Sequence, residues 1–144
     1  MKMTRIITMT ALVLSVITLG SCKKTVYQQV NQVYSAVYTI QIADWHTDNS
    51  ADPLFQRYVT LNVPEIDDQI VANGGVQVYL SFDNSKTPSN WDALPVAYGN
   101  GVTYSTIHSK GQLTIGYSAL TGFADLPSIV IYAKVIVLDA QPLD

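Results

Sequence analysis

The chain has 144 residues, of which 13% are charged, a formal net charge of −3 and a single cysteine. This acidic balance argues against nucleic-acid binding, because proteins of that class carry a basic stripe that contacts phosphate. One cysteine excludes an intramolecular disulfide and a zinc site made of cysteines. Valine, isoleucine, threonine and tyrosine abound, which favours β-structure.

The first residues have the pattern of a secretory leader. Residues 1–5 are short and basic, and residues 6–19 are apolar apart from threonine and serine. A transmembrane helix needs about 20 apolar residues, so this run is short for a span and fits a signal peptide. The leader closes with Leu19-Gly20-Ser21-Cys22, which resembles a bacterial lipobox. The alternative is an ordinary cleaved signal followed by an unrelated cysteine.

The lipobox implies lipid attachment at Cys22 and three segments: a lipoprotein signal peptide over 1–21, a lipidated tether over 22–35 and a folded domain over 36–144. Two or three acyl chains such as palmitate make a stable membrane anchor, whereas one chain binds only marginally. In the best-known sorting rule, an aspartate directly after the cysteine retains a lipoprotein at the inner membrane. Lys23 occupies that place. We therefore expect an outer-membrane lipoprotein, with its periplasmic or surface face left open.

Alternation between apolar and polar residues recurs along the predicted domain and is typical of strands with one buried face. Seven strands are predicted, over residues 37–43, 54–63, 76–82, 94–98, 102–109, 113–119 and 128–138. The stripe from Val76 to Phe82 is the cleanest, which predicts a strand in the centre of a sheet. Asn100-Gly101 and Lys110-Gly111 predict tight turns between neighbouring strands.

Helical signals are short. Val26, Val30 and Val33 follow a helical spacing, but an isolated helix of about a dozen residues is marginal in water, so we interpret this stretch as tether. Residues 65–72 form a connection with at most a helical turn. Parallel sheets need crossover helices, which are absent from the pattern. The predicted fold is therefore all-β, an antiparallel β-sandwich, immunoglobulin-like in general form, with a closed barrel as the second choice.

The densest polar stretch is 44–52, which offers three carboxylates and His46. Calcium takes oxygen ligands from loops of this kind. The regular spacing and the glycine of a calcium loop are missing, however, and aspartate and asparagine favour turns without any metal. We interpret the stretch as a solvated turn, with calcium as the alternative, and predict neither metal nor cofactor.

Catalytic patterns are weak throughout the chain. Glu65, Asp67 and Asp68 suggest paired carboxylates for glycoside hydrolysis, but adjacent strand residues point to opposite faces. His46 and His108 lie far apart in sequence and have no neighbours that activate a nucleophile. We therefore expect a non-catalytic protein and keep a carboxylate-based hydrolase as an unfavoured alternative.

Four aromatic residues are candidates for ligand contact. Tyr58 and Tyr79 fall on the polar faces of their predicted strands, and Trp45 and Trp91 fall in loops beside turns. Exposed aromatic rings stack on sugars and dominate protein interfaces. The alternative is that the tyrosines pair across strands and the tryptophans close the ends of the sandwich.

Several short motifs along the mature chain suggest a family. They are Asp44-Trp45, Leu61-Asn62-Val63-Pro64, Gly74-Gly75-Val76-Gln77-Val78-Tyr79-Leu80, Trp91-Asp92-Ala93-Leu94-Pro95 and Ala133-Lys134-Val135-Ile136-Val137. Together they resemble a group of uncharacterised small secreted or lipid-anchored domains of Gram-negative bacteria. The resemblance implies a compact β domain and brings no active residues with it.

The sequence therefore predicts a lipid-anchored cell-envelope protein that acts as a structural or binding module. It would be bound to the membrane by its N-terminal lipid. The second hypothesis is an accessory domain that recognises a glycan or an envelope protein through Trp45, Tyr58, Tyr79 and Trp91. Each of these functions needs a recognition surface that only the folded domain can reveal.

Overall fold

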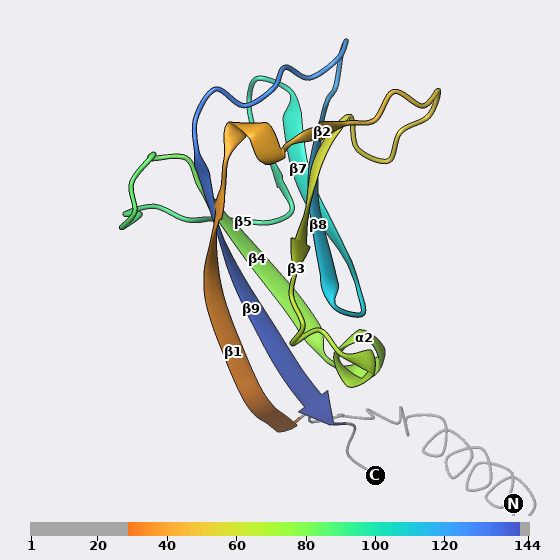
Figure 1. Ribbon diagram of the computed structural model, residues 1–144, viewed down its shortest axis with the longest axis vertical. Coiled ribbons are helices and arrows are strands. Elements are labelled where there is room, and N and C mark those ends of the chain that lie inside the picture. Colours follow the sequence, from red (N-terminus) through yellow and green to blue (C-terminus); the bar gives the residue numbers. More distant parts are fainter. Residues whose placement is uncertain (1–28, 142–144) are drawn as a thin grey trace, which may run out of the picture.

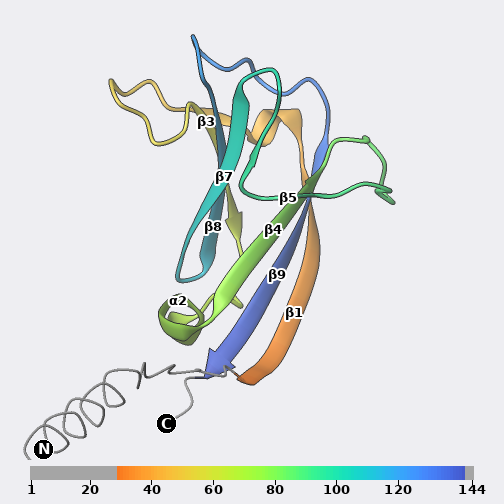
Figure 2. The ribbon, with the colours of Figure 1, turned by 180° about the vertical axis from the view of Figure 1, so that it is seen from behind.

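The protein is a sandwich of two antiparallel sheets (Figures 1 and 2), seen in a computed structural model that describes residues 29–141. The four-stranded sheet has the order β1-β9-β4-β5, and the five-stranded sheet has the order β2-β3-β8-β7-β6. The strands are β1 (Gln29–Ile40), β2 (His46–Thr47), β3 (Arg57–Asn62), β4 (Gly75–Ser81), β5 (Asp92–Ala93), β6 (Val96–Ala97), β7 (Val102–Ser109), β8 (Gln112–Ala119) and β9 (Ile131–Gln141). The two short helices are η1 (Ile42–Asp44) and α2 (Asp68–Asn73). The predicted β-sandwich is confirmed, and neither sheet closes into a barrel.

The hydrophobic core lies between the two sheets. Val78 and Leu80 of β4 face Leu113 and Ile115 of β8, and all four side chains are fully or almost fully buried. The alternation predicted for the stripe from Val76 to Phe82 therefore holds, with β4 lying inside its sheet between β9 and β5. Each buried aliphatic side chain of this kind stabilises the fold by roughly 1.5–3 kcal/mol relative to its exposed state.

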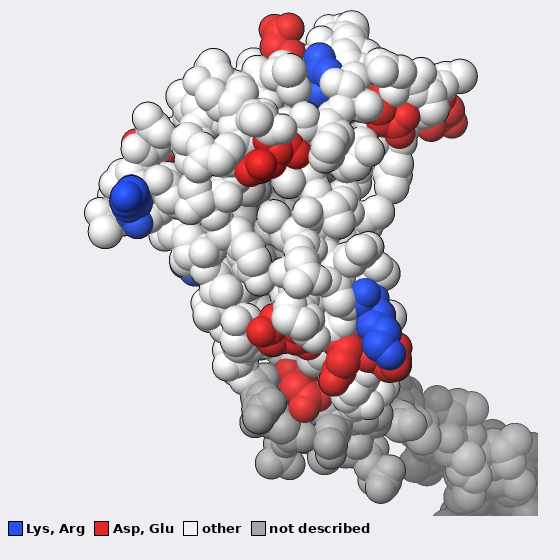
Figure 3. Space-filling model, viewed as in Figure 1, with Lys and Arg blue, Asp and Glu red and all other residues white. Residues whose placement is uncertain are grey.

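One end of the sandwich is closed by α2. Asp67 caps this helix by accepting a hydrogen bond from the Ile70 amide at 2.9 Å, and Ile70 is buried beneath it. Asp68 pairs with Lys110 of the β7–β8 turn. Both of these charges are exposed, so the pair adds little to stability. Figure 3 shows acidic side chains gathered near this end and few charges over the middle of the face.

Several boundaries differ from the sequence prediction. Residues 29–141 contain nine strands where seven were predicted, because the two-residue strands β2 and β5 were not expected. Residues 42–44 form η1 instead of ending the predicted strand 37–43, and β9 starts at Ile131 instead of residue 128. The first strand begins at Gln29 rather than at residue 37, so residues 29–35 belong to the sheet and not to a tether. The helical spacing of Val30 and Val33 is overridden because this backbone pairs with β9, with Val33 opposite Leu138. The predicted strand 94–98 is reduced to β6, because the Leu94 amide donates to the Val78 carbonyl oxygen of β4 in the four-stranded sheet, whereas β6 belongs to the five-stranded sheet.

The leader, the lipobox with Cys22 and the tether up to residue 28 lie outside the described residues. Within residues 29–141, no helix is long and apolar enough to cross a bilayer.

Candidate functional site

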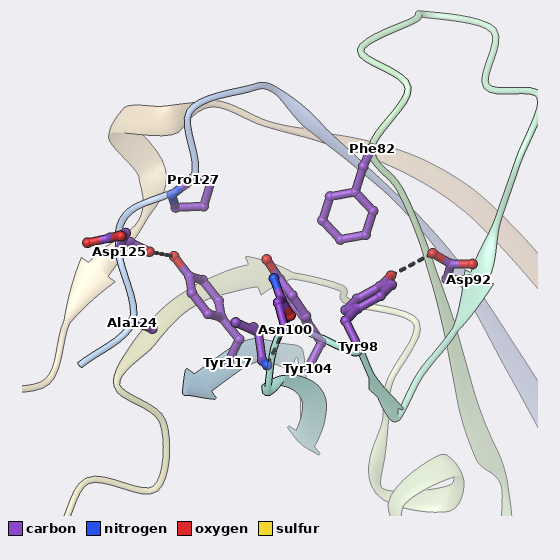
Figure 4. A pocket seen from close by; sticks show the side chains of 10 residues that line it. Phe82, Asp92, Tyr98, Asn100, Tyr104, Tyr117, Ala124, Asp125 and Pro127 are labelled. Atoms are coloured by element: carbon purple, nitrogen blue, oxygen red, sulfur yellow. Dashed lines mark hydrogen bonds between the residues drawn. The ribbon is translucent and has the colours of Figure 1, made fainter. Parts of the chain in front are cut away.

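A pocket of about 560 Å³ opens at the end of the sandwich opposite α2 (Figure 4). Its walls come from the end of β4, from β5, from the β6–β7 hairpin, from β8 and from the β8–β9 loop. The lining residues are Phe82, Asp92, Tyr98, Asn100, Val102, Tyr104, Tyr117, Ala124, Asp125 and Pro127. Small-molecule sites typically have volumes of about 300–1,000 Å³ and mostly apolar walls, so this pocket has the size and character of such a site.

Strand register places the aromatic rings in the pocket. Tyr104 and Tyr117 are direct partners across β7 and β8, and their rings stack with centroids 4.7 Å apart. Phe82 continues the inward stripe of β4 beyond the end of that strand. Gly101 allows the hairpin to turn with a φ of 81°, which brings Tyr98 back against Tyr104.

The rings support one another by edge-to-face packing. Phe82 lies 5.8 Å from Tyr98 and 5.4 Å from Tyr104, measured between ring centroids. Beneath the pocket, Trp45 packs edge-on against Tyr117 at 5.1 Å. Each such pair contributes about 0.5–1.5 kcal/mol beyond the burial of its area. The aromatic wall is therefore formed before any ligand arrives.

Polar groups ring this aromatic wall. The Tyr98 hydroxyl donates to the Asp92 carboxylate at 2.5 Å, and the Tyr117 hydroxyl donates to the Asp125 carbonyl oxygen at 2.6 Å. The Asn100 side-chain oxygen (Oδ1) accepts from the Val102 amide at 3.2 Å, which leaves the Asn100 NH₂ group available. These groups present both donors and acceptors to whatever enters the pocket.

Tyr104 differs from the other tyrosines of the pocket. Only 8% of the residue is exposed, yet its hydroxyl reaches the pocket and has no hydrogen-bond partner among the described residues (Figure 4). Burial raises the pKa of Tyr104 to about 12. Burial also raises the pKa of Tyr98 and of Tyr117, and the Asp92 hydrogen bond adds to the rise at Tyr98. All three hydroxyls therefore stay neutral at physiological pH.

The β8–β9 loop forms one wall of the pocket and is held by two side chains from the start of β3. The Gln56 side-chain oxygen accepts from the amides of Ala119 and Ala124, at 2.9 and 2.8 Å. The Arg57 Nε donates to the Ala124 carbonyl oxygen at 2.8 Å, and the guanidinium lies over the Phe123 ring. Gln56 and Arg57 thus fix an irregular loop by side-chain bonds. In the sequence, Arg57 shares one face of its strand with the apolar Val59 and Leu61, and these contacts explain why a charged residue stands there.

The four aromatic residues predicted from the sequence lie elsewhere. Trp45 is buried below the pocket, and Tyr58 lies beside His46 with ring centroids 5.5 Å apart. Tyr79 and Trp91 do come together: both rings pack against Lys134 of β9, whose Nζ is 4.9 and 4.5 Å from their centroids. None of the four lines the end pocket.

The predicted carboxylates are also dispersed. Asp67 caps α2 and Asp68 pairs with Lys110, so the two point to different partners. Glu65 and Asp139 line a second cavity of about 240 Å³ beside α2. In the 44–52 stretch, Asp44 accepts from the Gln41 amide and Asp48 from the Ser50 amide, as in turns. No cluster of three His, Cys, Asp or Glu side chains in residues 29–141 is placed to hold a metal.

Comparison with protein-family models, with curated proteins and with solved structures finds no match for this chain. The resemblance to small envelope domains therefore stays a prediction, and function has to be argued from the pocket itself.

Deleting two tyrosine hydroxyls tests which of them is hydrogen-bonded to the protein. Tyr117→Phe removes the bond to Asp125 and should lower the free energy of unfolding by about 1 kcal/mol. Tyr104→Phe removes a hydroxyl without a protein partner and should change the free energy of unfolding by less than about 0.5 kcal/mol. Urea unfolding followed by tyrosine fluorescence measures both. An equal loss in the two variants would contradict the assignment of the Tyr104 hydroxyl as unbonded.

Proposed function

We propose that the protein is a lipid-anchored module of the cell envelope that binds a small ligand in the end pocket and does not catalyse a reaction. The observation that supports this proposal best is the aromatic pocket formed by Phe82, Tyr98, Tyr104 and Tyr117. Its lining contains no histidine, cysteine, serine or lysine. Of its two carboxylates, Asp92 accepts a hydrogen bond from Tyr98, and the Asp125 side chain is directed away from the pocket in Figure 4. Its tyrosines have raised pKa values, which disfavours them as bases at neutral pH.

The position of the pocket agrees with anchoring through Cys22. β1 starts at Gln29, beside the α2 end of the sandwich, and runs for 12 residues toward the pocket end (Figure 1). At about 3.3 Å per residue, this strand spans roughly 40 Å. A lipid attached at Cys22 would therefore hold the α2 end near the membrane and present the pocket to the surrounding solution.

A second surface supports recognition of an envelope protein or glycan as an alternative function. Tyr79 and Trp91 come together around Lys134 on the outer face of the four-stranded sheet. The exposed Val37 is the neighbour of Lys134 in the adjacent strand, β1. Aromatic side chains with adjacent apolar area are common in protein interfaces.

The anchor is tested by replacing its sulfur. Cys22→Ser is expected to abolish incorporation of labelled palmitate completely, because the acyl chain is attached through that cysteine. Ser21→Ala keeps a small residue before the cysteine and should leave labelling and membrane fractionation unchanged. Palmitate labelling that survives Cys22→Ser would refute the anchor, and protease treatment of whole cells would show which face the domain occupies.

A further inference from the structure

We infer that the end pocket takes a neutral, hydroxyl-rich ring, which means a sugar unit such as a pyranoside. This inference rests on the proposed function, since it requires that the end pocket is the binding site. It is argued from the hydrogen-bonding groups that the pocket leaves unused and from the charges that its walls lack.

The Tyr104 hydroxyl requires a polar partner from the ligand. Its ring is more than nine-tenths buried within an aromatic cluster, so the side chain cannot rotate freely to find another partner. The hydroxyl points into the pocket without a protein hydrogen bond (Figure 4). A purely apolar ligand would displace water from this group and leave it unsatisfied, which is costly. The occupant must therefore offer a polar group at this point.

The remaining polar groups show what kind of polar ligand fits. The hydroxyls of Tyr98 and Tyr117 donate hydrogen bonds to the Asp92 carboxylate and the Asp125 carbonyl oxygen, so toward a ligand they can only accept. The Asn100 NH₂ group can only donate, and the Tyr104 hydroxyl can do either. A ligand hydroxyl both donates and accepts, so a ring with several hydroxyls can satisfy all of these groups at once.

Charge disfavours anionic ligands. No lysine or arginine lines the pocket, so a phosphate or carboxylate would lose its hydration without gaining a charged partner. A cation is the remaining competitor, because the Asp92 carboxylate keeps acceptor capacity after its hydrogen bond from Tyr98 and aromatic faces also attract cations. The comparison of choline with the sugars therefore decides between a cation and a sugar. Phe82 and Pro127 supply apolar walls, against which the C–H face of a sugar ring packs.

A titration followed by NMR tests the inference. Full-length ¹⁵N-labelled protein would be solubilised in a polyoxyethylene detergent, because sugar or choline headgroups would compete for the pocket. The sugar probes are methyl pyranosides of glucose, galactose, mannose and N-acetylglucosamine, together with their β-linked disaccharides. The comparison probes are cyclohexanol, choline and glucuronate. We expect at least one sugar to saturate amide shifts confined to the pocket segments, namely residues 82, 92, 98–104 and 117–127.

Two tyrosine variants show whether binding uses the assigned group. Tyr104→Phe keeps the aromatic wall and removes the hydroxyl, so it should weaken sugar binding about five- to tenfold. Tyr79→Phe removes a hydroxyl on the outer face of the other sheet and should leave the affinity unchanged. Sugar binding that is insensitive to Tyr104→Phe would overturn the assignment of this residue as the anchor point of the ligand.

The outcomes separate this inference from the proposed function. Saturable binding of cyclohexanol, choline or glucuronate in the pocket, with no binding of sugars, would overturn the sugar assignment and leave the binding function standing. No binding by any probe would overturn both. Among sugars, tighter binding of a disaccharide than of its methyl pyranoside would indicate a glycan chain, and equal binding would indicate a single sugar.

Discussion

Replacing Gly74 with alanine is expected to lower the free energy of unfolding by about 1–3 kcal/mol. A Cβ at this position would lie 2.5 Å from the Leu138 carbonyl oxygen and 2.9 Å from the Ile70 Cα. Both are backbone atoms, so no side chain can rotate away to relieve the contact. Gly74 ends α2 where the chain turns into β4, so the clash would push the helix off the end of the sandwich.

The adjacent residue provides a matched control. A Cβ at Gly75 has no heavy atom within 4 Å, and Gly75 has no left-handed φ. Gly75→Ala should therefore be neutral or slightly stabilising, by up to about 1 kcal/mol, because alanine restricts the unfolded chain. Urea unfolding of the two variants measures the difference. Equal destabilisation by both substitutions would mean that helix closure does not depend on the close approach at Gly74.

Most of the fold could be predicted from the sequence because turns and the alternation of buried residues depend on residues that are close together in the chain. The two-residue turn at Lys110-Gly111 fixes the register of β7 and β8, and that register is observed, with Ser109 opposite Gln112. The alternation in β4 predicted the burial of Val78 and Leu80, but Ser81, on the predicted polar face, is buried as well. The start of β1 was missed because its valines also fit a helical spacing, and the deciding factor is the distant partner strand β9.

The pocket was less accessible to sequence reasoning because its walls come from segments that are far apart in the chain. One part could have been predicted, because the turn at Lys110-Gly111 places Tyr104 opposite Tyr117 in the hairpin. The contribution of Phe82 and Pro127 could not, because it depends on how the two sheets stack. Trp45 was predicted to be a contact residue because it lies in a loop, but its ring is buried and packs edge-to-face against Tyr117.

A second large effect is expected at Gly116, in the middle of β8. The Phe55 side chain lies directly over this glycine, and a Cβ there would be 2.6 Å from the Phe55 Cβ and closer still to the ring. Aromatic side chains often cover strand glycines in this way. Gly116→Ala should therefore displace Phe55 and lower the free energy of unfolding by about 1–3 kcal/mol. Gly99→Ala, where a Cβ has no heavy atom within 4 Å, is the control and should be near neutral.

A double-mutant cycle identifies the cause of the loss at Gly116. Phe55→Ala alone should destabilise the domain, because the half-buried ring loses its packing against β8. In the Phe55→Ala background the ring is gone and only the Cβ contact at 2.6 Å remains, so Gly116→Ala should cost at least about 1 kcal/mol less than in the wild type. The added methyl group then fills part of the space that the ring occupied. If Gly116→Ala costs the same in both backgrounds, the glycine is required for its backbone within the sheet rather than for its contact with Phe55.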